Sequence, residues 1–387
     1  MDTDAPQPPT TWHEPAPTVS GSRGRDRVQH DTELIDAYER IAQKGRVAWT
    51  GHHRLIRMLG RGGQGEVYLT EYRGTDNFTV PVAMKVFSPE RFAGRRSYEE
   101  TMARIAGIAA RVALIQHDNL LEVLNFFDRN NIRVMMMGFV DGYDLRQLIG
   151  PNCLAMLDGR VDADRWEYIN RVVLTAGSTQ SRFKPGVAVA IVREMLSALG
   201  ALHREGIVHG DVKPANIMLK RSGHAKLIDV GSAIDVDNPP RERECTPMYA
   251  APEVLEGGMA TPQSDLASLG YVLIELLAGQ SVFNPEAKFK QLLVAKRDLP
   301  QKLTKLLPQE VRRNEMLMKF LQRLISPDPS RRYVDAETAE HVEGGAAAFH
   351  RQLVMGDMAT EYTNDIRVWM EELKALETDT DEFDFDF

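Results

Sequence analysis

The stretch HGDVKPANIML, residues 209–219, places a carboxylate, an ammonium group and a carboxamide in one short turn ahead of an apolar run. Asp211 can accept a hydrogen bond from a hydroxyl nucleophile, Lys213 can offset negative charge on a phosphoryl group, and Asn216 can ligate a metal through its carbonyl oxygen. Each residue could equally cap a turn. The stretch therefore decides the fold only together with other phosphate-binding motifs in the right order.

A glycine-rich turn precedes this stretch in the chain. GRGGQGEV, residues 60–67, places Gly60, Gly62 and Gly65 between two strand-like segments. Glycines let backbone N–H groups approach a polyanion with no Cβ in the way. A strand rather than a helix follows, which argues against a dinucleotide-binding fold. An ordinary hairpin turn is the alternative reading of this motif by itself.

Two further charged residues fit the same chemistry. VAMK, residues 82–85, ends on Lys85 within a strand pattern, where the ammonium group can supply a point charge for phosphates. AKLIDVG, residues 225–231, presents Asp229 at the end of an apolar strand. A carboxylate is a hard oxygen ligand suited to Mg²⁺, the counterion of ATP.

With these motifs in this order, residues 54–343 resemble a eukaryotic-type (Hanks-type) serine/threonine protein kinase domain. APE (251–253), SDLASLGYVLIELLAG (264–279) and SPDPSRRY (326–333) extend the resemblance. It implies an α+β, bilobal fold with a β-rich N-lobe over 54–138 and a helical C-lobe over 139–343. It also implies transfer of the γ-phosphoryl group of ATP to Ser or Thr hydroxyls, with Mg²⁺ as metal and Mn²⁺ as the alternative.

The resemblance carries further roles onto single residues. Lys85, Asp211, Lys213 and Asn216 would be catalytic, and Asn216 and Asp229 would hold the metal. Asp265 would brace the catalytic loop, Arg332 would pair with Glu253, and Thr246 points to the serine/threonine subclass. Phosphates would lie on Gly60, Gly62 and Gly65, and adenine between the lobes on Val67, Ala83, Met137 as gatekeeper, Gly138, Val140 and Met218.

The chain departs from the family pattern at Gly210, where many such kinases have an arginine that binds a phosphorylated activation loop. Between Ser232 and Thr246 there is no Ser, Thr or Tyr. The two absences agree. The sequence therefore predicts activity that does not depend on activation-loop phosphorylation.

A second departure concerns the helix carboxylate that should pair with Lys85. The family places it at Ile108, and the nearest upstream acids are Glu99 and Glu100, roughly 12 Å earlier along a helix. We expect Glu100, or else Glu99, to serve, or the pair to be absent. Its absence would favour a pseudokinase that binds nucleotide as a scaffold or regulator. A small-molecule kinase is disfavoured by the APE motif and the Thr246 segment, which resemble a peptide-docking surface.

Segments outside the lobes are predicted from composition and periodicity. They are a disordered Pro-rich tail (1–30), a short helical lead-in (31–53) with a helix over 32–45, a polar surface insertion (about 150–185), a helical extension (344–376) and an acidic-aromatic tail (377–387). The tail DEFDFDF is either solvated or a docking or autoinhibitory peptide.

Bulk properties exclude several classes of protein. With 47 basic and 55 acidic residues the net charge is −8, which argues against nucleic-acid binding. No apolar run of membrane-spanning length is apparent, the acidic N-terminus does not resemble a signal peptide, and the two cysteines lack metal-ligand spacing. The sequence predicts a cytoplasmic protein without a membrane span, acting on protein substrates.

Overall fold

The computed structural model describes residues 32–44, 46–48, 52–240, 245–355 and 362–378. Within them, 32–116 and 121–140 form one compact unit, and 117–120 and 141–378 form another. The predicted Pro-rich tail (1–30) and residues 379–387 of the acidic-aromatic tail lie outside the described residues.

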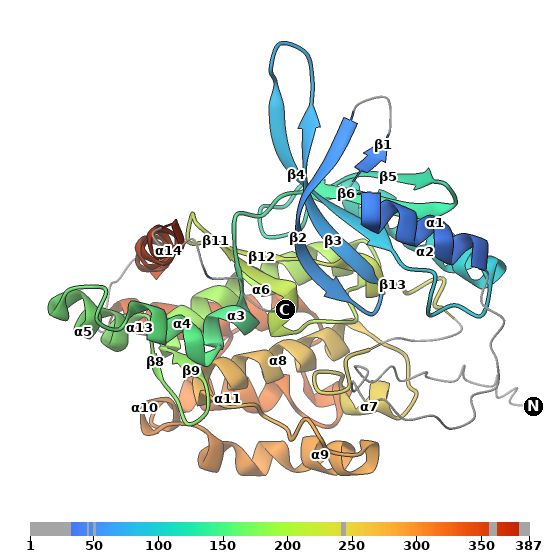
Figure 1. The fold of residues 1–387 in the computed structure, drawn as a ribbon. Helices are drawn as coiled ribbons and strands as arrows, with labels where there is room; N and C mark the ends of the chain where they lie inside the picture. The colour runs from blue at the N-terminus through green and yellow to red at the C-terminus, as the bar shows by residue number, and fades with distance from the viewer. Residues whose placement is uncertain (1–31, 45, 49–51, 241–244, 356–361, 379–387) are drawn as a thin grey trace, which may run out of the picture. The chain divides into compact units, whose positions relative to one another are not determined.

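The first unit is built on an antiparallel sheet of six strands in the spatial order β1-β2-β3-β4-β6-β5 (Figure 1). Burial alternates along β3, where Glu66, Tyr68 and Thr70 are buried, as the period of a strand requires. The strands are β1 (Arg46–Ala48), β2 (His52–Gly62), β3 (Gly65–Arg73), β4 (Thr79–Phe87), β5 (Val123–Arg129) and β6 (Ile132–Gly138). Sequence reasoning missed β5, which pairs with β6 at the edge of the sheet.

Two helices accompany this sheet. α1 (Thr32–Lys44) buries Leu34, Tyr38 and Ile41, at the spacing of one helical face. α2 (Arg95–Ala113) is held to two strands by one hydroxyl. Tyr98 Oη donates to the carbonyl of Phe87 in β4 at 3.2 Å and accepts from the Arg133 amide in β6 at 2.8 Å.

The second unit is mainly helical, around α6 (Pro185–Arg204) and α8 (Pro262–Ala278). α8 begins with a reciprocal cap between Thr261 and Ser264 and ends at Gly279 in the left-handed conformation, with φ 66°. The other helices are α3 (Leu145–Ile149), α4 (Pro151–Leu157), α5 (Ala163–Val172), α7 (Pro252–Leu255), α9 (Phe289–Leu306), α10 (Gln309–Arg312), α11 (Glu315–Leu324), α12 (Ala336–His341), α13 (Ala346–Met355) and α14 (Tyr362–Thr378).

Short strands and 3₁₀ turns connect these helices and carry the loops of interest. The strands are β7 (Gly142–Asp144), β8 (Leu174–Ala176), β9 (Ser181–Phe183), β10 (Ile207–Val208), β11 (Ile217–Lys220), β12 (Ala225–Leu227) and β13 (Ile234–Asp235). β12, β11 and β7 form one small antiparallel sheet, and β10 pairs with β13. The 3₁₀ turns are η1 (Pro214–Asn216), η2 (Val230–Ser232) and η3 (Pro329–Arg331).

The insertion and the C-terminal extension pack on each other. Residues 150–185, which we expected to form a surface insertion, also carry buried side chains, among them Phe183. Trp369 of α14 is fully buried and meets Phe183 edge to face at 5.8 Å. Arg165 forms two hydrogen bonds with Glu372, at 2.6 and 3.0 Å, so α5 and α14 are joined by charge as well as by apolar contact.

Among the described helices, α6 alone is long and apolar enough by composition to cross a membrane. Within the structure, 72% of its apolar window is buried. α6 contacts α8, α12, α13 and α14, which is the arrangement of a core helix of a globular domain.

Candidate active site

Three of the predicted catalytic side chains meet in the loop between β10 and β11. Lys213 Nζ lies 2.7 Å from Asp211 Oδ2, and Asn216 Nδ2 donates to the same oxygen at 3.0 Å. Thr246 joins them from 35 residues away, because its hydroxyl donates to Asp211 Oδ1 at 2.6 Å and accepts from Lys213 Nζ at 2.9 Å. Both carboxylate oxygens of Asp211 are therefore held in place.

Asp265, in the first turn of α8, holds the backbone of this loop through hydrogen bonds. Its side chain is 1% exposed and accepts hydrogen bonds from the backbone amides of His209, at 2.8 Å, and Gly210, at 2.9 Å. His203 Nε2 lies 3.0 Å from the same carboxylate. These contacts fix the backbone that leads into Asp211.

Gly210 has a left-handed backbone, with φ +75°. A Cβ at this position would lie 3.0 Å from the carbonyl oxygen of Ser232. A side chain here would therefore be strained by the backbone and crowded by Ser232. Glycine suits this turn, and with glycine the family's arginine is absent.

Asn216 and Asp229 carry the oxygen atoms that suit a divalent cation. The amide nitrogen of Asn216 donates to Asp211, which leaves its carbonyl oxygen as the ligating atom. Asp229 has φ 64° and uses Oδ1 to accept from the Gly231 amide at 3.0 Å. A carboxylate and an amide oxygen fit Mg²⁺, which prefers hard ligands and retains waters.

In the first unit the glycine-rich segment is a hairpin, with Gly62 paired to Gly65. Gly65 has φ +137°, and a Cβ there would lie 2.0 Å from the carbonyl oxygen of Val86. No side chain fits so close to backbone. Gly60, Gly62 and Gly63 have no neighbour within 4 Å of a Cβ position, so this end of the hairpin is open to a ligand.

Lys85 lies opposite Val67 in the β3–β4 pair and is 4% exposed. Its Nζ donates to Oε1 of Gln64 at 2.8 Å and lies 5.4 Å from the ring centroid of Phe87. Gln64 is itself anchored, since its carbonyl accepts from the Ser88 amide at 3.0 Å. The tip of the glycine hairpin and Lys85 are therefore coupled, which sequence reasoning did not anticipate because the residue is an unremarkable glutamine.

The expected pairing of Glu100 with Lys85 needs correction. Glu100 pairs with Arg96 at 2.8 Å, one helical turn away, and its side chain is 67% exposed. Glu99 pairs with Arg95 in the same way, at 3.0 Å. Both acids lie on the outer face of α2, because its buried face is apolar and includes Ile108.

The residues expected to contact adenine are divided between the two units. In the first, Ala83 is paired with Met137 across β4 and β6, and both are buried. The Gly138 amide donates to the carbonyl of Glu122 at 2.9 Å. Val67 and Val140 are half-buried in this unit, and Met218 is half-buried in β11 of the second.

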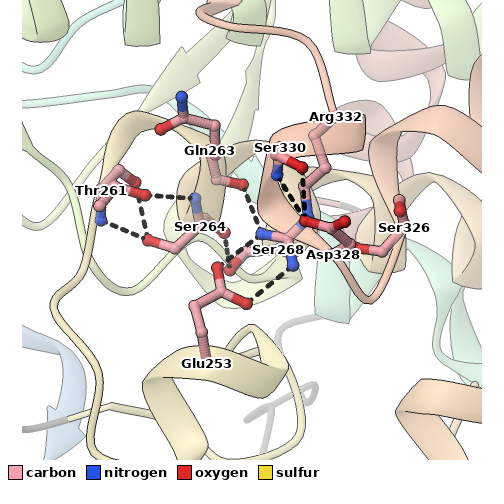
Figure 2. A network of polar contacts seen from close by, with 9 residues as sticks. All are labelled: Glu253, Thr261, Gln263, Ser264, Ser268, Ser326, Asp328, Ser330 and Arg332. Atoms are coloured by element: carbon pink, nitrogen blue, oxygen red, sulfur yellow. Dashed lines mark hydrogen bonds and ion pairs between the residues drawn. The ribbon is translucent and has the colours of Figure 1, made fainter.

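Arg332, which is fully buried, and Glu253, which is partly exposed, form the ion pair drawn in Figure 2. The Arg332 guanidinium donates to both oxygens of Glu253, at 2.6 and 2.7 Å. It also donates to the carbonyls of Gln263, at 2.9 Å, and Ser326, at 2.7 Å. One arginine thus ties α7, the start of α8 and the segment before η3 together.

A hydrogen bond between Tyr249, which follows Thr246 in the chain, and Glu275 of α8 was not anticipated from the sequence. Tyr249 Oη donates to Oε2 of Glu275 at 2.6 Å, and Gln180 reaches the other oxygen at 3.4 Å. Burial raises the pKa of Glu275 above its usual range. The signal was present in the sequence, because a lone acid within the apolar run of α8 needs a buried partner.

Comparison with known proteins assigns the family. The sequence model of the protein kinase domain family matches residues 53–342. Serine/threonine-protein kinase Pkn1 of Myxococcus xanthus is 29% identical over 337 residues, which cover 80% of this chain and 43% of that protein. PrkC of Bacillus subtilis is 26% identical over 301 residues, covering 76% of this chain and 40% of that protein. The chain thus spans less than half the length of these curated relatives.

Solved structures agree on the fold. The kinase domain of Mycobacterium tuberculosis PknI aligns with a TM-score of 0.52 at 25% identity, covering 80% of this chain and 98% of that chain. The predicted α+β fold, with a β-rich first part and a helical second part, is confirmed. The chain belongs to the protein kinase domain family.

Proposed function

We propose that this chain transfers the γ-phosphoryl group of Mg-ATP to serine or threonine hydroxyls of protein substrates. The observation that carries the proposal is the cluster of Asp211, Lys213, Asn216 and Thr246, in which an acid, a cation and an amide converge within hydrogen-bonding distance. Catalysis of phosphoryl transfer depends mainly on positioning and on charge stabilisation, and this cluster supplies both.

Each side chain of the cluster has a proposed task. Asp211 accepts the hydrogen bond of the incoming hydroxyl and orients it, and Lys213 offsets charge on the phosphoryl oxygens. Thr246 holds both in register, since its hydroxyl contacts each of them. Asn216 and Asp229 would hold Mg²⁺, or Mn²⁺ in its place, which supplies further positive charge at the phosphates.

The glycine hairpin and Lys85 are proposed to bind the phosphates of ATP. The hairpin presents backbone N–H groups, and Lys85 supplies a point charge from β4. Val67, Ala83, Met137, Gly138, Val140 and Met218 are the proposed adenine contacts.

The decisive experiment compares the wild type with Asp211→Asn and with Asp298→Asn, a control on the exposed face of α9. Each protein is incubated with labelled ATP and Mg²⁺, with a generic basic protein as substrate. The wild type and the control should transfer phosphate, and Asp211→Asn should lose at least about a hundredfold in rate. Equal rates for all three proteins, or no transfer by the wild type, would contradict the proposal.

We also propose that the activity needs no phosphate on the activation loop. The left-handed backbone at Gly210 would strain any side chain placed there, including the usual arginine, and the segment between Ser232 and Thr246 has nothing to phosphorylate. Protein treated with phosphatase and checked by mass spectrometry should keep its full rate. A rate that depends on phosphate within residues 232–249 would exclude this mechanism.

A pseudokinase is the second candidate, and one observation favours it. α2 turns an apolar face that includes Ile108 into the unit, and its acids Glu99 and Glu100 bind Arg95 and Arg96. A kinase whose α2 does not supply this carboxylate could bind nucleotide without transferring phosphate. ATP binding by calorimetry, together with no transfer in the assay above, would select this candidate.

Location and partners follow from composition. We propose a cytoplasmic protein that acts on protein substrates and binds no nucleic acid, in keeping with its net charge of −8. The tail at 377–387 is proposed to dock a partner through its phenylalanines. Deleting these residues should weaken substrate binding, and unchanged binding and activity would remove the idea.

A further inference from the structure

Lys296, in the middle of α9, is a fully buried lysine that the proposed mechanism does not use. Its side chain is 0% exposed, and Nζ donates to the carbonyl oxygen of Met248 at 2.6 Å. The same Nζ lies 4.1 Å from the ring centroids of Tyr271 and Phe283. These two rings meet edge to face at 5.2 Å and form an aromatic wall around the ammonium group.

Burying a lysine in such a site costs free energy, so we expect the amine to have a structural or functional role. Removing an ammonium group from water is costly, and burial lowers the pKa of Lys296 well below its usual value. Among the described residues Lys296 forms no ion pair with a carboxylate, so its partners are one carbonyl and two rings. A methionine of similar length would fill the same space without this desolvation. Packing alone therefore does not explain the residue.

The carbonyl that Lys296 holds belongs to the turn that follows Thr246. The amides of Tyr249 and Ala250 both donate to the carbonyl of Thr246, at 2.9 and 3.0 Å, so Met248 lies inside a closed turn. The Thr246 hydroxyl contacts Asp211 and Lys213. A single buried amine thus anchors the turn whose first residue contacts the proposed catalytic base.

We propose that Lys296 is a positioning residue for the protein substrate, which it serves by holding the turn 246–250 in the conformation that docks a peptide beside Asp211. The proposal rests on the protein kinase activity proposed above. It locates the effect in the protein substrate rather than in ATP, because among the described residues Lys296 contacts Met248 of this turn and the rings of Tyr271 and Phe283.

The test uses the full chain with Lys296→Met and, as a matched control, Lys302→Met. Lys302 lies on the same helix but is 56% exposed and paired with Asp298. With a generic basic protein as substrate, Lys296→Met should lower kcat/KM for the protein about ten- to a hundredfold, the range for losing a hydrogen bond from a charged donor. The KM for ATP should stay within about twofold. Lys302→Met should match the wild type in both.

A second measurement does not depend on activity. Amide hydrogen exchange of Tyr249 and Ala250 should become faster in Lys296→Met and stay unchanged in Lys302→Met. Lys296→Arg, which keeps the cation, should recover part of the protection. Midpoints of urea unfolding should be unchanged or higher in Lys296→Met, because the cost of burying an amine away from water is removed.

Failure of this inference can be distinguished from failure of the proposed function. The inference is overturned if Lys296→Met has the same kinetics and amide exchange as the wild type. It is also overturned if the variant does not fold, or if kcat/KM falls equally for ATP and for the protein substrate, since either result indicates a purely structural residue. If the wild type transfers no phosphate, the proposed function fails. The exchange experiment then still decides whether Lys296 holds the turn.

Discussion

Replacing Glu253 by glutamine should destabilise the helical unit by about 3–5 kcal/mol, the usual cost of leaving a buried charge without its partner. The Arg332 side chain is 0% exposed and that of Glu253 is 21% exposed, so the guanidinium itself stays out of water when the carboxylate is replaced. Of its four hydrogen bonds, the two to Glu253 are lost or weakened, and those to Gln263 and Ser326 remain. At about 1.5–3 kcal/mol for each charged bond, two bonds give a similar total.

The assay is equilibrium unfolding in urea, followed by tryptophan fluorescence, with Glu256→Gln as the control. Glu256 pairs with Arg297 at the surface, with side-chain exposures of 42% and 53%, so its replacement should cost no more than about 1 kcal/mol. Combining Glu253→Gln with Arg332→Met should show a coupling energy of about 2 kcal/mol or more. The reasoning is refuted if Glu253→Gln unfolds at the same urea concentration as Glu256→Gln.

Three more expectations follow from single contacts. Gly65→Ala should weaken ATP binding at least about tenfold in calorimetry, because its Cβ would lie 2.0 Å from the Val86 carbonyl and the hairpin must shift; unaltered affinity would contradict this. Trp369→Ala should lower the free energy of unfolding in urea by about 3–5 kcal/mol. Trp369→Phe should cost clearly less, since the buried indole N–H has no hydrogen-bond partner among the described residues. Equal losses would contradict the view that Trp369 stabilises the protein by apolar packing. Burial lowers the pKa of Lys296, so just below pH 10.5 the unfolded chain binds more protons than the folded chain. The stability of the wild type relative to Lys296→Met should therefore rise as the pH rises towards 10.5. A stability difference that stays constant with pH would rule this out.

Much of the proposed active site could be predicted because its determinants are local. Asp211, Lys213 and Asn216 share one turn, so their proximity follows from chain geometry. Helical periodicity placed α1 to within one residue, expected over 32–45 and found over 32–44, whereas the edge strand β5 was missed. The roles carried over from the family remain predictions until they are measured.

Contacts that depend on side-chain direction could not be read in this way. Periodicity showed that α2 was a helix, but not that Glu100 would turn outward to Arg96. Neither Gln64 nor the pairing of Tyr249 with Glu275 was anticipated. The extension at 344–376 was expected to be helical, yet nothing in its pattern indicated that Trp369 would pack against Phe183 of the insertion.

The sequence by itself therefore determined the fold class, a β-rich part followed by a helical part, and which residues share the turn at Asp211. These depend on local sterics, periodicity and motif spacing, which a linear chain carries directly. Only the tertiary structure decided that Lys296 would be buried beneath Met248, a residue 48 positions away, rather than lie in solvent as most lysines do. The physical reason is that burial and partner choice are set by packing between distant segments, and the one-dimensional pattern of α9 is the same whether its lysine meets water or a carbonyl.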